Sequence, residues 1–142
     1  MSLELNKQRS VRALSMWASD NDDKAEDLFT GEYVNHQEPG VEGGVVDKCL
    51  EEWKALVEGF HQSFSNAQAK ILMQIAEGDL VSTRWEFTAT HTGEFMGLAP
   101  TGNVVVWKGV QIDQHKDGMI IESWVDWDKY SFFEGIGLVG KA

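Results

Sequence analysis

The chain has 142 residues, 42% of them apolar, which suits one folded domain with its own core. Its 12 basic and 23 acidic residues give a net charge of -11, which argues against nucleic-acid binding and against an anionic membrane surface. Six tryptophans and seven phenylalanines are many for this length. Such side chains can fill a core or line a cavity.

Cysteine usage and the N-terminal segment predict the compartment. The single cysteine, Cys49, excludes an internal disulfide. The first ten residues lack a basic region followed by an apolar run, so we expect no signal peptide. No stretch approaches the roughly 18 apolar residues of a membrane span. We therefore expect a soluble, cytoplasmic protein.

The first half of the chain predicts helices. Apolar spacing indicates an amphipathic helix over residues 3–18 and a second, shorter helix through Leu28 and Phe29. Residues 31–36 suit a short strand, and residues 38–44 form a loop. The clearest helix is expected over about residues 45–64, where one apolar stripe repeats every three or four residues.

The second half changes to the two-residue period of β-strands. We expect strands over residues 67–77, 80–90, 104–115 and 119–128, followed by a short helix. Residues 78–79 and 116–118 are turns, and residues 92–103 form a loop. Helices followed by an antiparallel meander predict a single α+β domain over residues 1–142, with the helices on one face of the sheet.

The last expected strand carries carboxylates beside aromatic residues. Its alternation puts Glu122, Trp124, Asp126 and Asp128 on one face and Trp127 on the other. If the first face points to solvent, it is only a charged outer surface. If it points inward, burial raises the pKa of a carboxylate and makes it a competent proton acceptor. The alternation alone leaves both interpretations open.

The histidines and glycines indicate no cofactor. No two histidines have helical metal-ligand spacing and no cysteine joins them, so we expect no metal site. No glycine cluster matches a phosphate-binding fingerprint, so we expect no nucleotide. His36 and His91 end strands, where pocket residues tend to lie. A lone histidine on a strand is nevertheless more often structural.

Several sequence blocks together carry a family resemblance. Residues 76–85 read AEGDLVSTRW, residues 90–102 read THTGEFMGLAPTG and residues 116–124 read KDGMIIESW, with Asp128 four residues later. Residues 31–36, GEYVNH, look like an early Tyr-x-x-His segment. In this order they resemble the SnoaL-like polyketide cyclases, or ester cyclases, of the nuclear transport factor 2-like superfamily.

The resemblance implies a fold and an activity. The fold is a conical, cystatin-like α+β barrel, in which a curved antiparallel sheet wraps around helices and encloses an apolar pocket. The implied reaction is an aldol-type cyclisation of a hydrophobic carbonyl compound, with no metal or organic cofactor. The resemblance also implies a homodimer through the outer sheet face, to which Trp127 and the polar face of Ser82, Arg84 and Glu86 could contribute. That polar face could equally be solvated. It favours an inward-facing Trp124 and Asp128.

Site residues follow from the motif positions. Asp128 matches the acid/base Asp, His36 the early His, and His91 the His of the Thr-His-x-Gly block, which could instead shape its loop. Asp126 is a reserve candidate on the same face as Asp128. We expect Asp128 to remove a proton α to a carbonyl while His36 stabilises the enolate oxygen. The implied substrate-binding residues are Trp124, Trp85, Phe60, Phe64, Tyr33 and Gln111.

Departures from the family pattern keep other hypotheses open. Met119 stands where the family commonly has Lys, and residues 134–137 read EGIG where the family often ends Gln-Leu-Gly. One alternative is a small-molecule-binding module without chemistry. Another is an isomerase or dehydratase that uses the same scaffold without closing a ring.

Overall fold

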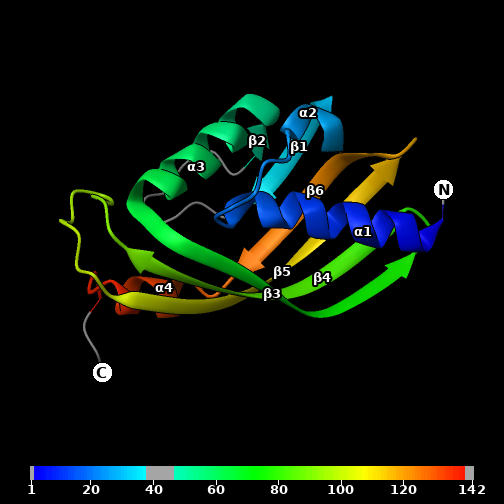
Figure 1. The fold of residues 1–142 in the computed structure, drawn as a ribbon. Helices are drawn as coiled ribbons and strands as arrows, with labels where there is room; N and C mark the ends of the chain where they lie inside the picture. The colour runs from blue at the N-terminus through cyan, green and yellow to red at the C-terminus, as the bar shows by residue number, and fades with distance from the viewer. Residues whose placement is uncertain (1, 38–46, 140–142) are drawn as a thin grey trace.

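The computed structural model describes residues 2–37 and 47–139 (Figure 1). The loop expected at residues 38–44 and the first two residues of the long helix expected over 45–64 lie outside this range. The helices are α1 (Leu3–Leu14), the 3-10 turn η1 (Ser15–Trp17), α2 (Ala25–Leu28), α3 (Leu50–Ser63) and α4 (Lys129–Gly135). The strands are β1 (Phe29–Gln37), β2 (Asp47–Cys49), β3 (Phe64–Glu77), β4 (Leu80–His91), β5 (Val104–Lys116) and β6 (Met119–Trp127).

Helix α3 begins later than the sequence predicts. Residues 47–49 pair with β1 as strand β2 instead of extending the helix. The Glu52 carboxylate accepts a hydrogen bond from the Cys49 backbone N–H at 3.2 Å, which caps the first turn. Trp53 and Val57 bury the apolar stripe of the helix. Within the described residues, none of the helices has the length and apolar character needed to cross a membrane.

The six strands form one sheet in the order β2-β1-β6-β5-β4-β3. Strands β3 to β6 are the expected antiparallel meander. Strand β1 pairs in parallel with β6, a contact between distant segments that no local pattern predicts. The sheet is curved, and α1 and α3 lie on its concave side (Figure 1). The predicted α+β architecture, with helices packed in a curved sheet, is confirmed.

Strand β6 turns the opposite face inward from the one that the resemblance favours. Its register against β5 shifts between Gln114 and His115, where β6 carries an extra residue. Simple alternation would put Ile120 on the same face as Trp124 and Asp126. Because of the bulge, Ile120 is buried in the core, whereas Trp124 and Asp126 turn outward. Trp124 is 37% exposed and Asp126 is exposed. The expected inward orientation of Trp124 is therefore wrong.

Candidate ligand pocket

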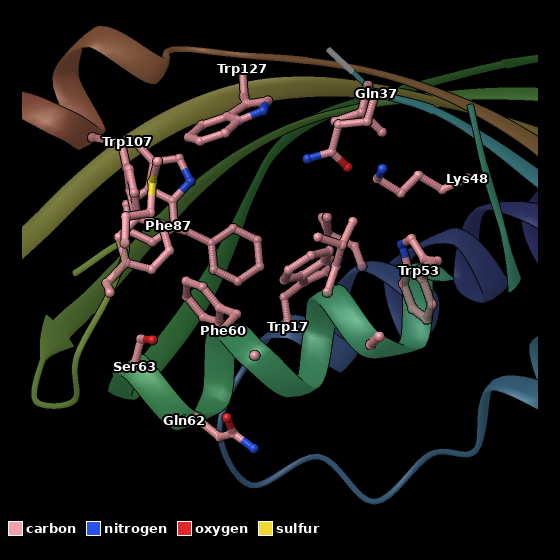
Figure 2. Close-up of a pocket in the computed structure, with 18 of the residues that line it drawn as sticks. Trp17, Gln37, Lys48, Trp53, Phe60, Gln62, Ser63, Phe87, Trp107 and Trp127 are labelled. Atoms are coloured by element: carbon pink, nitrogen blue, oxygen red, sulfur yellow. The ribbon is translucent and has the colours of Figure 1, made fainter. Parts of the chain in front are cut away.

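A cavity of about 720 Å³ lies between the concave face of the sheet and helix α3 (Figure 2). Five of the six tryptophans line it, and Trp124 is the exception. Apolar and aromatic walls of this size suit a small hydrophobic ligand. The aromatic lining residues are Trp17, Trp53, Phe60, Trp85, Phe87, Phe95, Trp107, Trp127, Phe132 and Phe133.

The sheet forms the floor of the cavity, and one row of residues, paired in register across neighbouring strands, shapes it. Gly109 on β5 pairs with Trp85 on β4 and with Trp127 on β6. A Cβ atom on Gly109 would lie 2.4 Å from Cζ2 of Trp85, so the missing side chain is what lets this indole lie across the strand. Among the described residues, the buried indole nitrogens of Trp85 and Trp127 have no hydrogen-bond partner.

The next row carries two glutamines that line the cavity. Gln37 on β1 pairs with Val125 on β6, and Val125 pairs with Gln111 on β5. The Gln111 amide nitrogen donates to Asp113 Oδ1 at 2.8 Å. The Gln37 amide oxygen accepts from the Asn35 amide nitrogen at 3.1 Å. Each glutamine is thus held by a buried side chain behind it.

Asp113 is the centre of a buried polar network. Its side chain is 1% exposed, and its Oδ1 also accepts from the Ser123 hydroxyl at 2.5 Å. Burial raises the pKa of Asp113, while hydrogen bonds from Gln111, Ser123 and Ser10 oppose the rise. Burial, and then the charge of Asp113, raises the pKa of Tyr33. The Tyr33 hydroxyl therefore stays protonated and can donate.

His115 extends this network toward helix α1. Its Nε2 lies 2.9 Å from the Ser10 hydroxyl. Burial, and secondarily the positive charge of Arg9, lowers the pKa of His115 to about 4. The imidazole is therefore neutral at pH 7. Within residues 2–37 and 47–139, no group of three or more His, Cys, Asp or Glu side chains is placed to hold a metal ion.

The predicted substrate-binding residues divide into lining and supporting positions. Phe60, Trp85 and Gln111 line the cavity. Phe64 stacks behind Phe60 with ring centroids 4.9 Å apart. Tyr33 is 1% exposed and donates to Asn35 Oδ1 at 3.3 Å. Neither Phe64 nor Tyr33 is part of the cavity wall.

The predicted acid/base Asp lies elsewhere. Asp128 is exposed and caps helix α4, accepting from the Ser131 backbone N–H at 3.0 Å and from its hydroxyl at 2.6 Å. These hydrogen bonds lower the pKa of Asp128, which weakens it as a proton acceptor. Asp126 lies on the outer face of the sheet. Neither carboxylate lines the cavity.

The predicted histidines also lie outside the cavity wall. His36 Nε2 lies 2.5 Å from the Glu122 carboxylate, and its ring stacks on Trp124 with centroids 5.4 Å apart. His91 is fully buried, and its Nδ1 accepts from the Thr101 backbone N–H at 3.2 Å. This contact helps to hold the loop after β4, the alternative expected for His91.

Sequence reasoning missed Asp113 as a buried carboxylate. The available signal was the alternation along β5, which puts Trp107, Gly109, Gln111 and Asp113 on one face. An acidic residue on a strand face that also carries a tryptophan is a candidate for burial.

Comparison with known proteins places the chain in a family. The sequence model of the SnoaL-like polyketide cyclases matches residues 8–135. The chain belongs to the SnoaL-like polyketide cyclase family. No protein of curated function matches the chain significantly.

Several solved structures share the fold. AclR of Streptomyces galilaeus, a proposed hydroxylase, is 25% identical with a TM-score of 0.85, over 99% of this chain and 90% of AclR. IdmH of Streptomyces antibioticus, a proposed polyketide cyclase, is 24% identical with a TM-score of 0.80, over 93% of this chain and 98% of IdmH. A proposed SnoaL-like polyketide cyclase from a Jannaschia species is 18% identical with a TM-score of 0.79, over 96% of this chain and 94% of the Jannaschia protein.

Proposed function

We propose that this SnoaL-like protein is a cyclase that binds a hydrophobic carbonyl compound in the cavity and closes a ring by an aldol-type step through an enol. Family membership supports the reaction class. The observation that carries the proposal is an aromatic cavity whose floor presents two amide groups, Gln37 and Gln111, each held from behind. As the resemblance implies, the proposal invokes no metal or organic cofactor.

The cavity walls would contribute by holding a flexible ligand in a folded conformation. Confining the two reacting carbons in one geometry freezes the rotatable bonds between them, and this removes part of the entropic cost of ring closure before the reaction begins. Aromatic side chains also exclude water from the reactive enol. The two glutamines are then the polar contacts for the ligand oxygens.

The proton acceptor in this proposal is Glu94. Of the described residues that line the cavity, two carry titratable groups, Lys48 and Glu94. A carboxylate is a common general base in enolisation. The acid/base roles of Asp128, Asp126 and His36 stay predictions, and their places outside the cavity wall favour Glu94 over them.

Exchange of α-protons tests enolisation directly. 2-Tetralone is a small bicyclic ketone, and ¹H NMR in D₂O follows the loss of its α-protons. We expect the protein to accelerate the exchange over buffer, and Glu94→Gln to lose about 10²–10⁴-fold of that rate. Glu51→Gln removes an exposed carboxylate that does not line the cavity and serves as the matched control.

The comparison with Asp128→Asn decides between the two carboxylates. If Asp128→Asn abolishes exchange and Glu94→Gln does not, Asp128 is the base and our assignment is wrong. If 2-tetralone binds without any acceleration of exchange, the cyclase proposal fails.

That last outcome would support a second candidate, a small-molecule-binding module. One observation favours it: Asp113, the carboxyl group of the buried network, is not part of the described cavity wall, and Glu94 itself is exposed. A cavity without a buried titratable group binds ligands but has little means to move protons.

We also propose that the protein is a homodimer formed through the outer sheet face. Val104, Val106, Ile112 and Trp124 are 65%, 48%, 37% and 37% exposed on β5 and β6, an apolar patch that a second copy would cover. Trp127, expected to contribute, lines the cavity instead. Sedimentation equilibrium should find a dimer that Ile112→Glu dissociates, and a monomeric wild type would contradict the proposal.

A further inference from the structure

We propose that the cavity floor recognises a paired carbonyl and hydroxyl, with Gln37 donating to the carbonyl oxygen and Gln111 accepting from the hydroxyl. The ligand class is then a β-hydroxy ketone. The inference rests on the proposed function only in taking the cavity as the ligand site. It adds which polar pattern the ligand carries and which residues orient the two amides.

The orientation of Gln111 is set by Asp113. A carboxylate oxygen that accepts can be satisfied only by the NH₂ end of the amide, and Gln111 Nε2 lies 2.8 Å from Asp113 Oδ1. The Ser123 hydroxyl donates to the same oxygen. The other carboxyl oxygen can therefore carry a proton without disturbing Gln111, so its amide orientation is the same in both charge states of Asp113. The Gln111 carbonyl oxygen remains for the ligand, as an acceptor.

The orientation of Gln37 is set by a second relay. The Tyr33 hydroxyl donates to Asn35 Oδ1 at 3.3 Å, which turns the NH₂ end of Asn35 toward Gln37. That NH₂ group donates to Gln37 Oε1 at 3.1 Å. Figure 2 shows the Gln37 nitrogen on the side of Trp127 and its oxygen on the side of Lys48. The Gln37 NH₂ group remains for the ligand, as a donor.

The sheet also sets the spacing of the two groups. Gln37 and Gln111 lie in register on either side of Val125, so two strand spacings of about 4.8 Å separate their backbones. If the two side chains stand parallel on the sheet and the ligand lies between their amide groups, two hydrogen bonds of about 2.9 Å leave about 4 Å between the two ligand oxygens. Oxygens on carbons in a 1,3-relationship match this span.

Four bicyclic probes of similar shape test the pair: indane, 1-indanone, 3-hydroxy-1-indanone and 3-methoxy-1-indanone. Each is titrated by calorimetry against the full chain and its variants. The ratio of indanone to indane affinity reports the contact to the carbonyl. The ratio of hydroxy to methoxy compound reports donation by the ligand hydroxyl. Comparing each ratio between wild type and variant cancels the different hydration of the probes.

Isosteric variants separate the two contacts. We expect Gln37→Met to lower the carbonyl ratio about 3–10-fold and leave the hydroxyl ratio unchanged, the range that one net hydrogen bond produces. Gln111→Met should lower only the hydroxyl ratio, by a similar factor. Gln62→Met is the matched control, because Gln62 also lines the cavity but is exposed on α3 and points away from its centre (Figure 2).

Variants behind the floor test the positioning residues. Asn35→Asp places an acceptor behind Gln37 and so turns the Gln37 NH₂ group away from the ligand. We expect the carbonyl ratio to fall as far as it does in Gln37→Met, while indane still binds. Asp113→Asn keeps an acceptor oxygen behind Gln111 and should keep the hydroxyl ratio. If circular dichroism finds Asn35→Asp unfolded, the two Gln→Met variants decide the question by themselves.

The outcomes distinguish this inference from the proposed function. The polarity assignment would be overturned, while the cavity stays a ligand site, by either of two results. In one, both ratios are the same in wild type and in the two Gln→Met variants. In the other, Gln37→Met lowers the hydroxyl ratio and Gln111→Met lowers the carbonyl ratio. If none of the four probes binds, the cavity is not a site for such compounds, and the inference and the proposed function fail together.

Discussion

Replacing Gly109 by alanine tests how the cavity floor is built. The added Cβ would lie 2.4 Å from Cζ2 and 2.7 Å from Cη2 of Trp85, and 2.8 Å from the backbone oxygen of Asp126. All three distances are shorter than the 3.0 Å that real Cβ contacts respect. Because one of the three atoms is backbone, a side-chain rotation alone does not relieve the overlap. The Trp85 indole must move toward the cavity and β6 must shift.

The cost follows from overpacking. Extra atoms in a packed interior cost about 1–3 kcal/mol. The lower chain entropy of unfolded alanine returns about 0.4–1 kcal/mol. The middles of the two ranges leave a decrease of about 1.3 kcal/mol in the free energy of unfolding, and their limits leave at most about 2.6 kcal/mol. At about 4 °C per kcal/mol for a domain of this size, Tm falls by about 5 °C, and by about 10 °C at most. The displaced indole should also weaken 2-tetralone binding.

Thermal unfolding by circular dichroism and calorimetric titration with 2-tetralone measure both effects. Gly59→Ala is the control, because Gly59 lines the same cavity from helix α3 and an added Cβ would meet no atom within 4 Å. Alanine is favoured over glycine inside a helix by about 0.5–1 kcal/mol, so its Tm should rise. A Gly109→Ala protein as stable as the wild type, with unchanged affinity, would refute this account of the floor.

Two further predictions concern titratable groups. Asp128→Ala should lower the free energy of unfolding by about 1 kcal/mol through loss of the helix cap, and Asp128→Asn should recover most of it. Hydrogen bonds from Ser131 lower the pKa of Asp128 from its ordinary value of 3.8. The difference in free energy of unfolding between wild type and Asp128→Ala should therefore be full at neutral pH and shrink as pH falls below about 3.8. Urea unfolding at several pH values measures this difference, and a difference that does not change with pH would contradict the prediction. For His115, the folded pKa of about 4 lies below the ordinary 6.5, so the unfolded chain takes up the proton first and stability falls as pH drops from 6.5 to 4. His115→Gln should flatten that part of the urea-unfolding profile, and an unchanged slope would show that another group titrates there.

Local patterns predicted most of the elements because periodicity reports burial. Strand β4 is the clearest case, since Val81, Thr83, Trp85, Phe87 and Ala89 are all buried as the alternation predicts. The helical stripe of α3 was found for the same reason. Its start was misplaced because pairing with β1 takes residues 47–49 into the sheet.

The candidate site was predicted less well than the fold. Trp85, Phe60 and Gln111, which the resemblance implies as substrate-binding residues, line the cavity. Asp128 and His36 were carried over by motif position, and motif position does not say which side of a strand faces a cavity. One residue of offset reverses the face, which is why Gln37 lines the cavity and its neighbour His36 does not.

The sequence by itself determined the order of helices and strands, the family and the aromatic character of the pocket, because these depend on residue type and local spacing. Only the tertiary structure decided which tryptophans line the cavity. The bulge in β6 turns Trp124 outward and leaves Trp127 inside, and the parallel pairing of β1 with β6 brings Gln37 into the same row as Gln111. Strand register and strand partner depend on contacts between distant segments, which no local pattern contains.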